Sequence, residues 1–91
     1  MTPPDSFLTA FFALPQGTLT GHAGDRHYVA SRSVLAGGQS HKLVAHELGG
    51  KDYISLNLYL TRSGKALLRP CEMPAEKVVE FVLSLRPNVH I

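Results

Sequence analysis

The sequence has only one cysteine, Cys71, so the chain cannot form an internal disulfide bond. This scarcity is typical of proteins that fold in the reducing cytoplasm. Long apolar stretches are missing too, since the N-terminal apolar run covers only residues 7–14 and follows Asp5 rather than a basic residue. A signal peptide starts with basic residues, and a transmembrane helix needs about 20 apolar residues. We therefore expect a cytoplasmic protein with no membrane partner.

Motifs that would indicate catalysis are also missing. The glycine-containing segments at residues 21–25 and 36–39 do not match phosphate-binding loops, which need a strand, a fixed glycine spacing and a helix. Cys71 precedes a predicted helix, where a thiol can be activated, but a cysteine at such a joint is more often a small packed side chain. No acid, base and nucleophile cluster along the chain. We therefore expect no enzymatic activity and no cofactor.

The five histidines do not follow a metal-ligand spacing. His22 and His27 can face each other across a hairpin, whereas His41 and His46 fall on opposite faces of a strand. Zinc needs three or four ligands, and the sequence brings no third ligand to the His22–His27 pair. We therefore expect no metal site.

The composition is that of an ordinary folded domain, with 44% hydrophobic and 18% charged residues. We expect one domain that spans residues 1–91. A domain of this size buries about 60–65% of the surface that its unfolded chain exposes, which leaves a small stability margin. Association of subunits is a common way to increase that margin.

The clearest local pattern is YISLNLYLT, residues 53–61, in which apolar and polar side chains alternate. A period of two predicts a β-strand with one buried face. One side carries Ile54, Leu56, Leu58 and Leu60. The other side carries Tyr53, Ser55, Asn57, Tyr59 and Thr61. This second side has two tyrosines and no charge, which suits a binding surface better than an ordinary solvated face.

A β-hairpin is predicted over residues 17–35. Gly24 and Asp25 form a plausible two-residue turn between its strands. This turn places His22 opposite His27.

Two more segments extend the predicted sheet. Residues 66–70 follow a turn and read as another strand. Residues 41–48 read either as a strand joined to residues 53–61 by a four-residue glycine-rich loop, or as a helix that would make residues 27–61 a β–α–β crossover. We favour the strand because the loop suits a hairpin.

A helix is predicted at each end of the chain. Residues 5–14 stop before Pro15, and residues 74–86 start with Pro74 at the first helical position. The C-terminal helix repeats apolar residues at three- and four-residue spacing, at Val78, Phe81, Val82 and Leu85. The elements together predict an α+β fold: a meander-like antiparallel sheet of four to five strands, with both helices packed on one face.

The charges are unevenly distributed along the chain. Between Arg26 and Pro70 there are seven basic and two acidic residues, a net charge of +5, whereas the two ends together carry −3. A basic sheet face with interleaved tyrosines is the surface expected for single-stranded nucleic acid, because cations contact phosphates while rings stack on bases.

We therefore expect a small binding or regulatory protein that binds nucleic acid, preferably single-stranded. The predicted contact residues are Tyr28, Arg32, Lys42, Tyr53, Asn57, Tyr59, Arg62, Lys65 and Arg69. The alternative is a protein-interaction module or small inhibitor that uses the same face or the phenylalanine-rich N-terminal helix. Phe7, Phe11 and Phe12 of that helix are the predicted interface of a homodimer, because apolar area that one small core cannot hide marks an interface.

Overall fold

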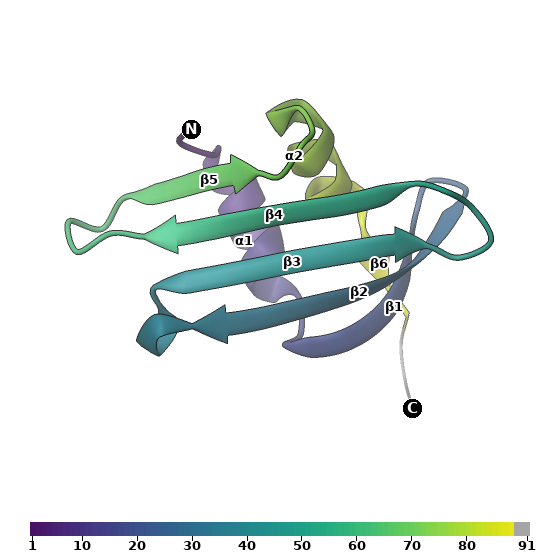
Figure 1. Cartoon of the computed structure of the whole chain (residues 1–91), viewed down its shortest axis with the longest axis horizontal. Coiled ribbons are helices and arrows are strands. Elements are labelled where there is room, and N and C mark those ends of the chain that lie inside the picture. The colour runs from purple at the N-terminus through teal and green to yellow at the C-terminus, as the bar shows by residue number, and fades with distance from the viewer. Residues whose placement is uncertain (89–91) are drawn as a thin grey trace.

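The computed structural model describes residues 1–88. In residues 1–88 the chain forms two α-helices, six β-strands and one short 3-10 helix (Figure 1). The helices are α1 (Asp5–Ala13), η1 (Ala36–Gly38) and α2 (Ala75–Ser84). The strands are β1 (Gly17–Ala23), β2 (Arg26–Leu35), β3 (Ser40–Glu47), β4 (Tyr53–Leu60), β5 (Ala66–Pro70) and β6 (Arg86–Pro87).

The strands form one antiparallel sheet in the order β5-β4-β3-β2-β1-β6. Strands β1 to β5 are a meander, since each pairs with its neighbour in the chain. The expected α+β fold is confirmed, with six strands instead of four to five. The additional strand is β6, which pairs Pro87 with Gly21 of β1. Gly21 allows this approach, because a Cβ atom there would lie 2.8 Å from the carbonyl oxygen of Arg86.

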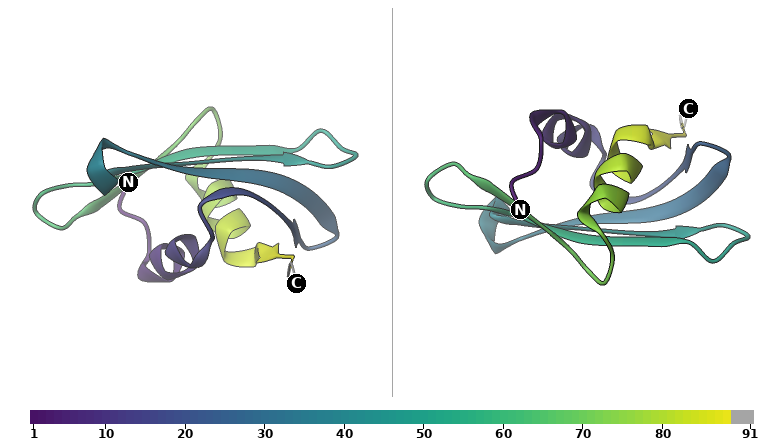
Figure 2. Two further views of the ribbon diagram at one scale, coloured as in Figure 1. Left: turned by 90° about the horizontal axis from the view of Figure 1, so that it is seen from below. Right: turned by 90° about the horizontal axis from the view of Figure 1, so that it is seen from above.

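Both helices lie on the same side of the sheet (Figure 2). We call this side the covered face and the opposite side the uncovered face. The covered face is lined by the apolar set predicted for β4, of which Ile54, Leu56 and Leu58 are buried. They join side chains from both helices in one core. Burial of each such side chain contributes about 1.5–3 kcal/mol before the loss of conformational entropy is subtracted.

Each helix begins directly after a proline. Pro4 and Pro74 occupy the N-cap positions with extended backbone angles, so α2 starts one residue later than its sequence predicts. Leu14 ends α1 because the residue before a proline is driven out of the helical region. Within residues 1–88, neither helix combines the length and the apolar character that crossing a lipid bilayer requires.

The ambiguous segment at residues 41–48 is a strand. It lies within β3, which pairs with β2 on one side and β4 on the other. The helical alternative and its β–α–β crossover are therefore wrong. The predicted hairpin register is confirmed, since His22 pairs with His27.

The phenylalanines of α1 belong mainly to the core of the subunit. Phe7 and Phe11 are 0% exposed, and their ring centroids lie 5.7 Å apart. The prediction that they form a dimer interface is wrong for these two residues, because the core of one subunit already covers them. Phe12 is 42% exposed and is the one member of the predicted set that can contact a partner.

Arg32 holds the end of α1 against the sheet. Its Nη1 donates a hydrogen bond of 2.6 Å to the carbonyl oxygen of Leu14, directly after the helix. The guanidinium carbon lies 5.0 Å from the centroid of the Phe11 ring and 5.5 Å from that of Phe12. Burial lowers the pKa of Arg32, which shows that desolvation opposes the charge. The interactions of the guanidinium with the C-terminal end of α1 and with the two aromatic rings compensate for part of this desolvation cost.

We expect truncation of the two adjacent phenylalanines to have very different effects on stability. Phe11→Ala should lower the free energy of unfolding by about 3–5 kcal/mol, because it leaves a cavity in the core. Phe12→Ala should lower it by about 1 kcal/mol, because its ring is partly solvated already. Urea denaturation followed by circular dichroism measures both. Equal losses would contradict the assignment of Phe11 to the core and Phe12 to the surface.

Candidate functional site

The uncovered face carries five of the nine predicted ligand-contacting residues. Its strand side chains include two cations, Lys42 and Arg69, and two exposed tyrosines, Tyr53 and Tyr59. None of the strand residues on this face is acidic. The one acidic strand residue is Glu47, which belongs to the other face and accepts a hydrogen bond from the backbone of the β3–β4 turn. The face therefore presents positive charge without a competing carboxylate.

Strand register places three of the predicted contact residues side by side. Asn57 of β4 pairs with Lys42 of β3 on one side and with Arg69 of β5 on the other. Adjacent strands are about 4.8 Å apart, so the amide lies between two cations. The Nδ2 of Asn57 also donates a hydrogen bond of 3.4 Å to the Sγ of Cys71, which holds the amide in place.

The two tyrosines of β4 differ in their surroundings. Tyr53 is 39% exposed, but its ring stacks on His46 with centroids 6.5 Å apart, and the Lys77 Nζ lies 6.0 Å from its centroid. Tyr59 is 37% exposed and makes no such aromatic or cation contact with any residue in 1–88. Tyr59 therefore offers a ring without a neighbour of this kind, whereas the Tyr53 ring has one aromatic and one cationic neighbour.

Two further predicted contact residues, Arg62 and Lys65, lie in the turn between β4 and β5. Both are exposed there. Hydrogen bonds fix the turn: the Thr61 backbone N–H donates to the Lys65 carbonyl oxygen at 2.8 Å, and the Lys65 N–H donates to the Thr61 Oγ1 at 3.1 Å. Gly64 takes a φ of +82° that other residues rarely adopt. This turn extends the positive charge beyond the end of the strand that carries Tyr59.

Two predicted contact residues do not belong to this face. Tyr28 is 3% exposed and Arg32 is 6% exposed, and both lie on the covered face with Ala30 between them. Their predicted place on the exposed tyrosine and arginine face is wrong, because β2 directs its even-numbered side chains under the helices. The burial of Arg32 could not be predicted from the sequence, because a strand that buries an arginine shows no regular alternation of apolar and polar residues.

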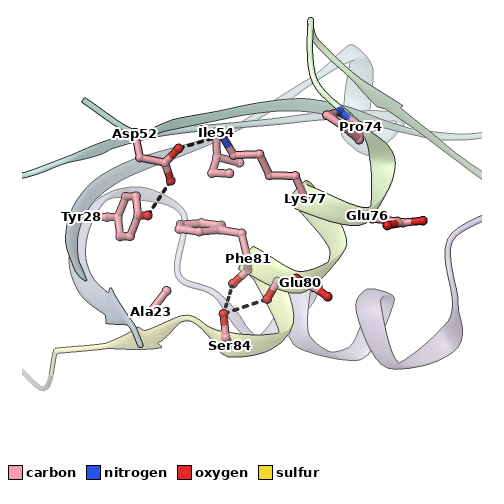
Figure 3. A pocket seen from close by; sticks show the side chains of 10 residues that line it. All are labelled: Ala23, Tyr28, Asp52, Ile54, Pro74, Glu76, Lys77, Glu80, Phe81 and Ser84. Atoms are coloured by element: carbon pink, nitrogen blue, oxygen red, sulfur yellow. Dashed lines mark hydrogen bonds and ion pairs between the residues drawn. The ribbon is translucent and has the colours of Figure 1, made fainter. Parts of the chain in front are cut away.

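A cavity of about 410 Å³ opens on the helix side, between α2 and the turns at one end of the sheet (Figure 3). Its walls include Tyr28, Ile54 and Phe81, and its rim carries Glu76 and Glu80 of α2. The Tyr28 and Phe81 rings meet edge to face, with centroids 4.8 Å apart. The sequence does not reveal this cavity, because its lining residues come from separate segments between residues 23 and 84.

Asp52 is the centre of the polar contacts in this cavity. It accepts hydrogen bonds of 2.7 Å from the Lys77 Nζ and from the Tyr28 hydroxyl (Figure 3). The Arg26 guanidinium lies 3.6 Å away from the same carboxylate. The hydrogen bonds from Lys77 and then from Tyr28 lower the pKa of Asp52. Burial, followed by the bond to Asp52, raises the pKa of Tyr28. A carboxylate with both oxygens bound in this way fastens α2 to the sheet and is a poor general base.

The histidines do not assemble a metal site within residues 1–88, where no group of three or more His, Cys, Asp or Glu side chains is placed to hold an ion. The rings of His22 and His27 lie 6.0 Å apart and tilted, as the hairpin requires. His41 is buried on the covered face, where its Nε2 lies 2.9 Å from the Gly38 carbonyl oxygen.

Comparison of the chain with models of protein families, with curated proteins and with solved structures finds no match. The function must therefore be argued from the geometry of the uncovered face and of the cavity. The cavity is organised by contacts that stabilise the fold. The uncovered face carries polar and aromatic groups that the fold does not use.

We expect Asp52 to stabilise the protein at neutral pH and to stop doing so in acid. Asp52→Asn should lower the free energy of unfolding at pH 7 by about 1–2 kcal/mol, because the partner cations are partly solvated. The lowered pKa means that this contribution is present above the ordinary aspartate value of 3.8 and is lost as the pH falls through the lowered value.

Urea denaturation at a series of pH values measures this difference. Asp25→Asn is a matched control, since Asp25 is exposed in the β1–β2 turn and forms no salt bridge with a residue in 1–88. A stability difference for Asp52→Asn that stays constant down to pH 2, below the ordinary aspartate range, would contradict the assigned role.

Proposed function

We propose that this protein binds single-stranded nucleic acid on the uncovered face and does not catalyse a reaction. The observation that carries the proposal is the row formed by Arg69, Asn57 and Lys42, with the free ring of Tyr59 beside it and no acidic strand residue on the same face. Cations that neutralise phosphates and rings that stack on bases are the two requirements of a single-strand platform.

The location of Tyr59 within a β-strand favours a single strand over a duplex. Tyr59 lies on a sheet and not on a protruding helix or loop, so its ring can stack only on a base whose face is accessible. Bases in a duplex stack on one another, whereas those of single strands can be splayed onto aromatic side chains. A duplex would contact the same cations through its phosphates but would leave the ring unused.

A protein partner is the second candidate, and the low charge density of the uncovered face favours it. Interface centres are enriched in tyrosine and depleted of charged residues. Such a partner, or a second copy of the chain in a homodimer, would bind to the uncovered face. Phe12 is the residue of α1 that remains available for an interface of its own. Association of this kind would depend weakly on salt, which separates it from binding to phosphates.

Fluorescence anisotropy with a labelled single strand of about 12 nucleotides tests the proposal. The logarithm of the association constant should fall linearly with the logarithm of the salt concentration, since phosphate contacts release counterions. Lys42→Ala and Arg69→Ala should each weaken binding and should each reduce the steepness of that line by about 0.7.

Lys51→Ala is the matched control. Lys51 is an exposed cation in the β3–β4 turn, at the opposite end of β4 from Tyr59 and the β4–β5 turn. Its removal changes the net charge equally but should leave the salt dependence unchanged. Undetectable binding at low salt would refute nucleic-acid binding by this face.

A further inference from the structure

We infer that the uncovered face contains one nucleotide subsite, centred on Tyr59, and that Tyr53 does not take part in it. This inference rests on the proposed function and says where on the face a base and its flanking phosphates are held. The two tyrosines have the same strand, the same face and nearly equal exposure. The distinction between them therefore comes from what surrounds each ring.

Tyr53 is occupied from two sides. The His46 ring lies nearly parallel to it, with an interplanar angle of 24° and a centroid distance of 6.5 Å, so a base would compete with the imidazole for one ring face. The Lys77 Nζ donates a hydrogen bond to Asp52 on the covered face of the sheet and lies 6.0 Å from the centroid of the same ring. Lys77 can reach this ring because β5 ends at Pro70 and does not flank this part of β4. A base that stacked on Tyr53 would have to displace contacts that help to fasten α2.

Tyr59 has the uncharged Ser40 and Leu67 as its cross-strand neighbours, and cations lie beyond it in both directions along β4. The Arg69–Asn57–Lys42 row is one step away on the same face, about 7 Å along the strand. In the opposite direction the chain enters the turn with Arg62 and Lys65. A base that stacks on Tyr59 therefore has positive charge both before and after it along β4, where the two phosphates that flank a nucleotide need it.

Asn57 is placed to contact the edge of the stacked base. Its Nδ2 uses one hydrogen on the Cys71 Sγ, which leaves the second hydrogen and the Oδ1 without a partner among residues 1–88. One donor next to one acceptor matches the donor and acceptor pairs on base edges. Asn57 is thus a specificity-determining residue, while Lys42 and Arg69 hold phosphates of any sequence.

The matched pair Tyr59→Ala and Tyr53→Ala tests the subsite by anisotropy with oligoadenylate, oligocytidylate and oligothymidylate. Tyr59→Ala should weaken binding about tenfold, the loss of one stacked base. Tyr59→Phe should keep the affinity, because it keeps the ring. Tyr53→Ala should keep the affinity as well. Circular dichroism and a urea titration of each variant establish that the compared proteins are folded.

Asn57→Ala provides a second readout. The wild-type protein should discriminate among the three oligonucleotides, and Asn57→Ala should bind all three with similar affinity while keeping the salt dependence. Wild-type binding with equal losses for both tyrosine variants, or with the base preference retained in Asn57→Ala, would overturn the subsite and leave the proposed function standing. No binding by the wild-type protein would overturn both.

Discussion

The packing of two helices on the same face of one sheet is the constraint on which the rest of the structure depends. Helix α1 comes from the start of the chain and α2 from its end, and together they bury the apolar side of β4. Arg32 and Asp52 fasten them, the first at the end of α1 and the second through Lys77 of α2. Because both helices lie on one face, the polar and aromatic side chains of the other face are left to the solvent or to a ligand.

Much of this arrangement could be predicted where the pattern of residues is regular. The alternation in residues 53–61 identified β4 and both of its faces, and two prolines marked helix ends: Pro15 the end of α1 and Pro74, to within one residue, the start of α2. The pattern was least informative in β2, where a buried arginine and a buried tyrosine interrupt the apolar positions. Their burial depends on the Leu14 carbonyl and on Asp52, partners that lie far away in the sequence.

Only part of the candidate site could be predicted from the sequence, because the rest again depends on residues that are distant along the chain. Asn57 and Tyr59 could be assigned to a free face from β4 alone, because alternation within one strand fixes it. The position of Lys42 and Arg69 beside Asn57 depends on the register of three strands, which the sequence of any one strand does not specify. The difference between Tyr53 and Tyr59 depends on His46 and on a lysine of α2, so only the three-dimensional structure could show it.

The sequential order of the strands has a consequence for how the chain reaches this structure. Hairpins between consecutive strands bring together residues that are close in sequence, so β1 to β5 can pair early and rapidly. The two helices contact each other from opposite ends of the chain, and β6 joins β1 only after α2 is complete. Closing the long loop between the two helices therefore costs more conformational entropy than closing any of the hairpins. During synthesis, α1 is made first and can cover its part of the apolar face, whereas the part that α2 covers stays exposed until that last helix has left the ribosome.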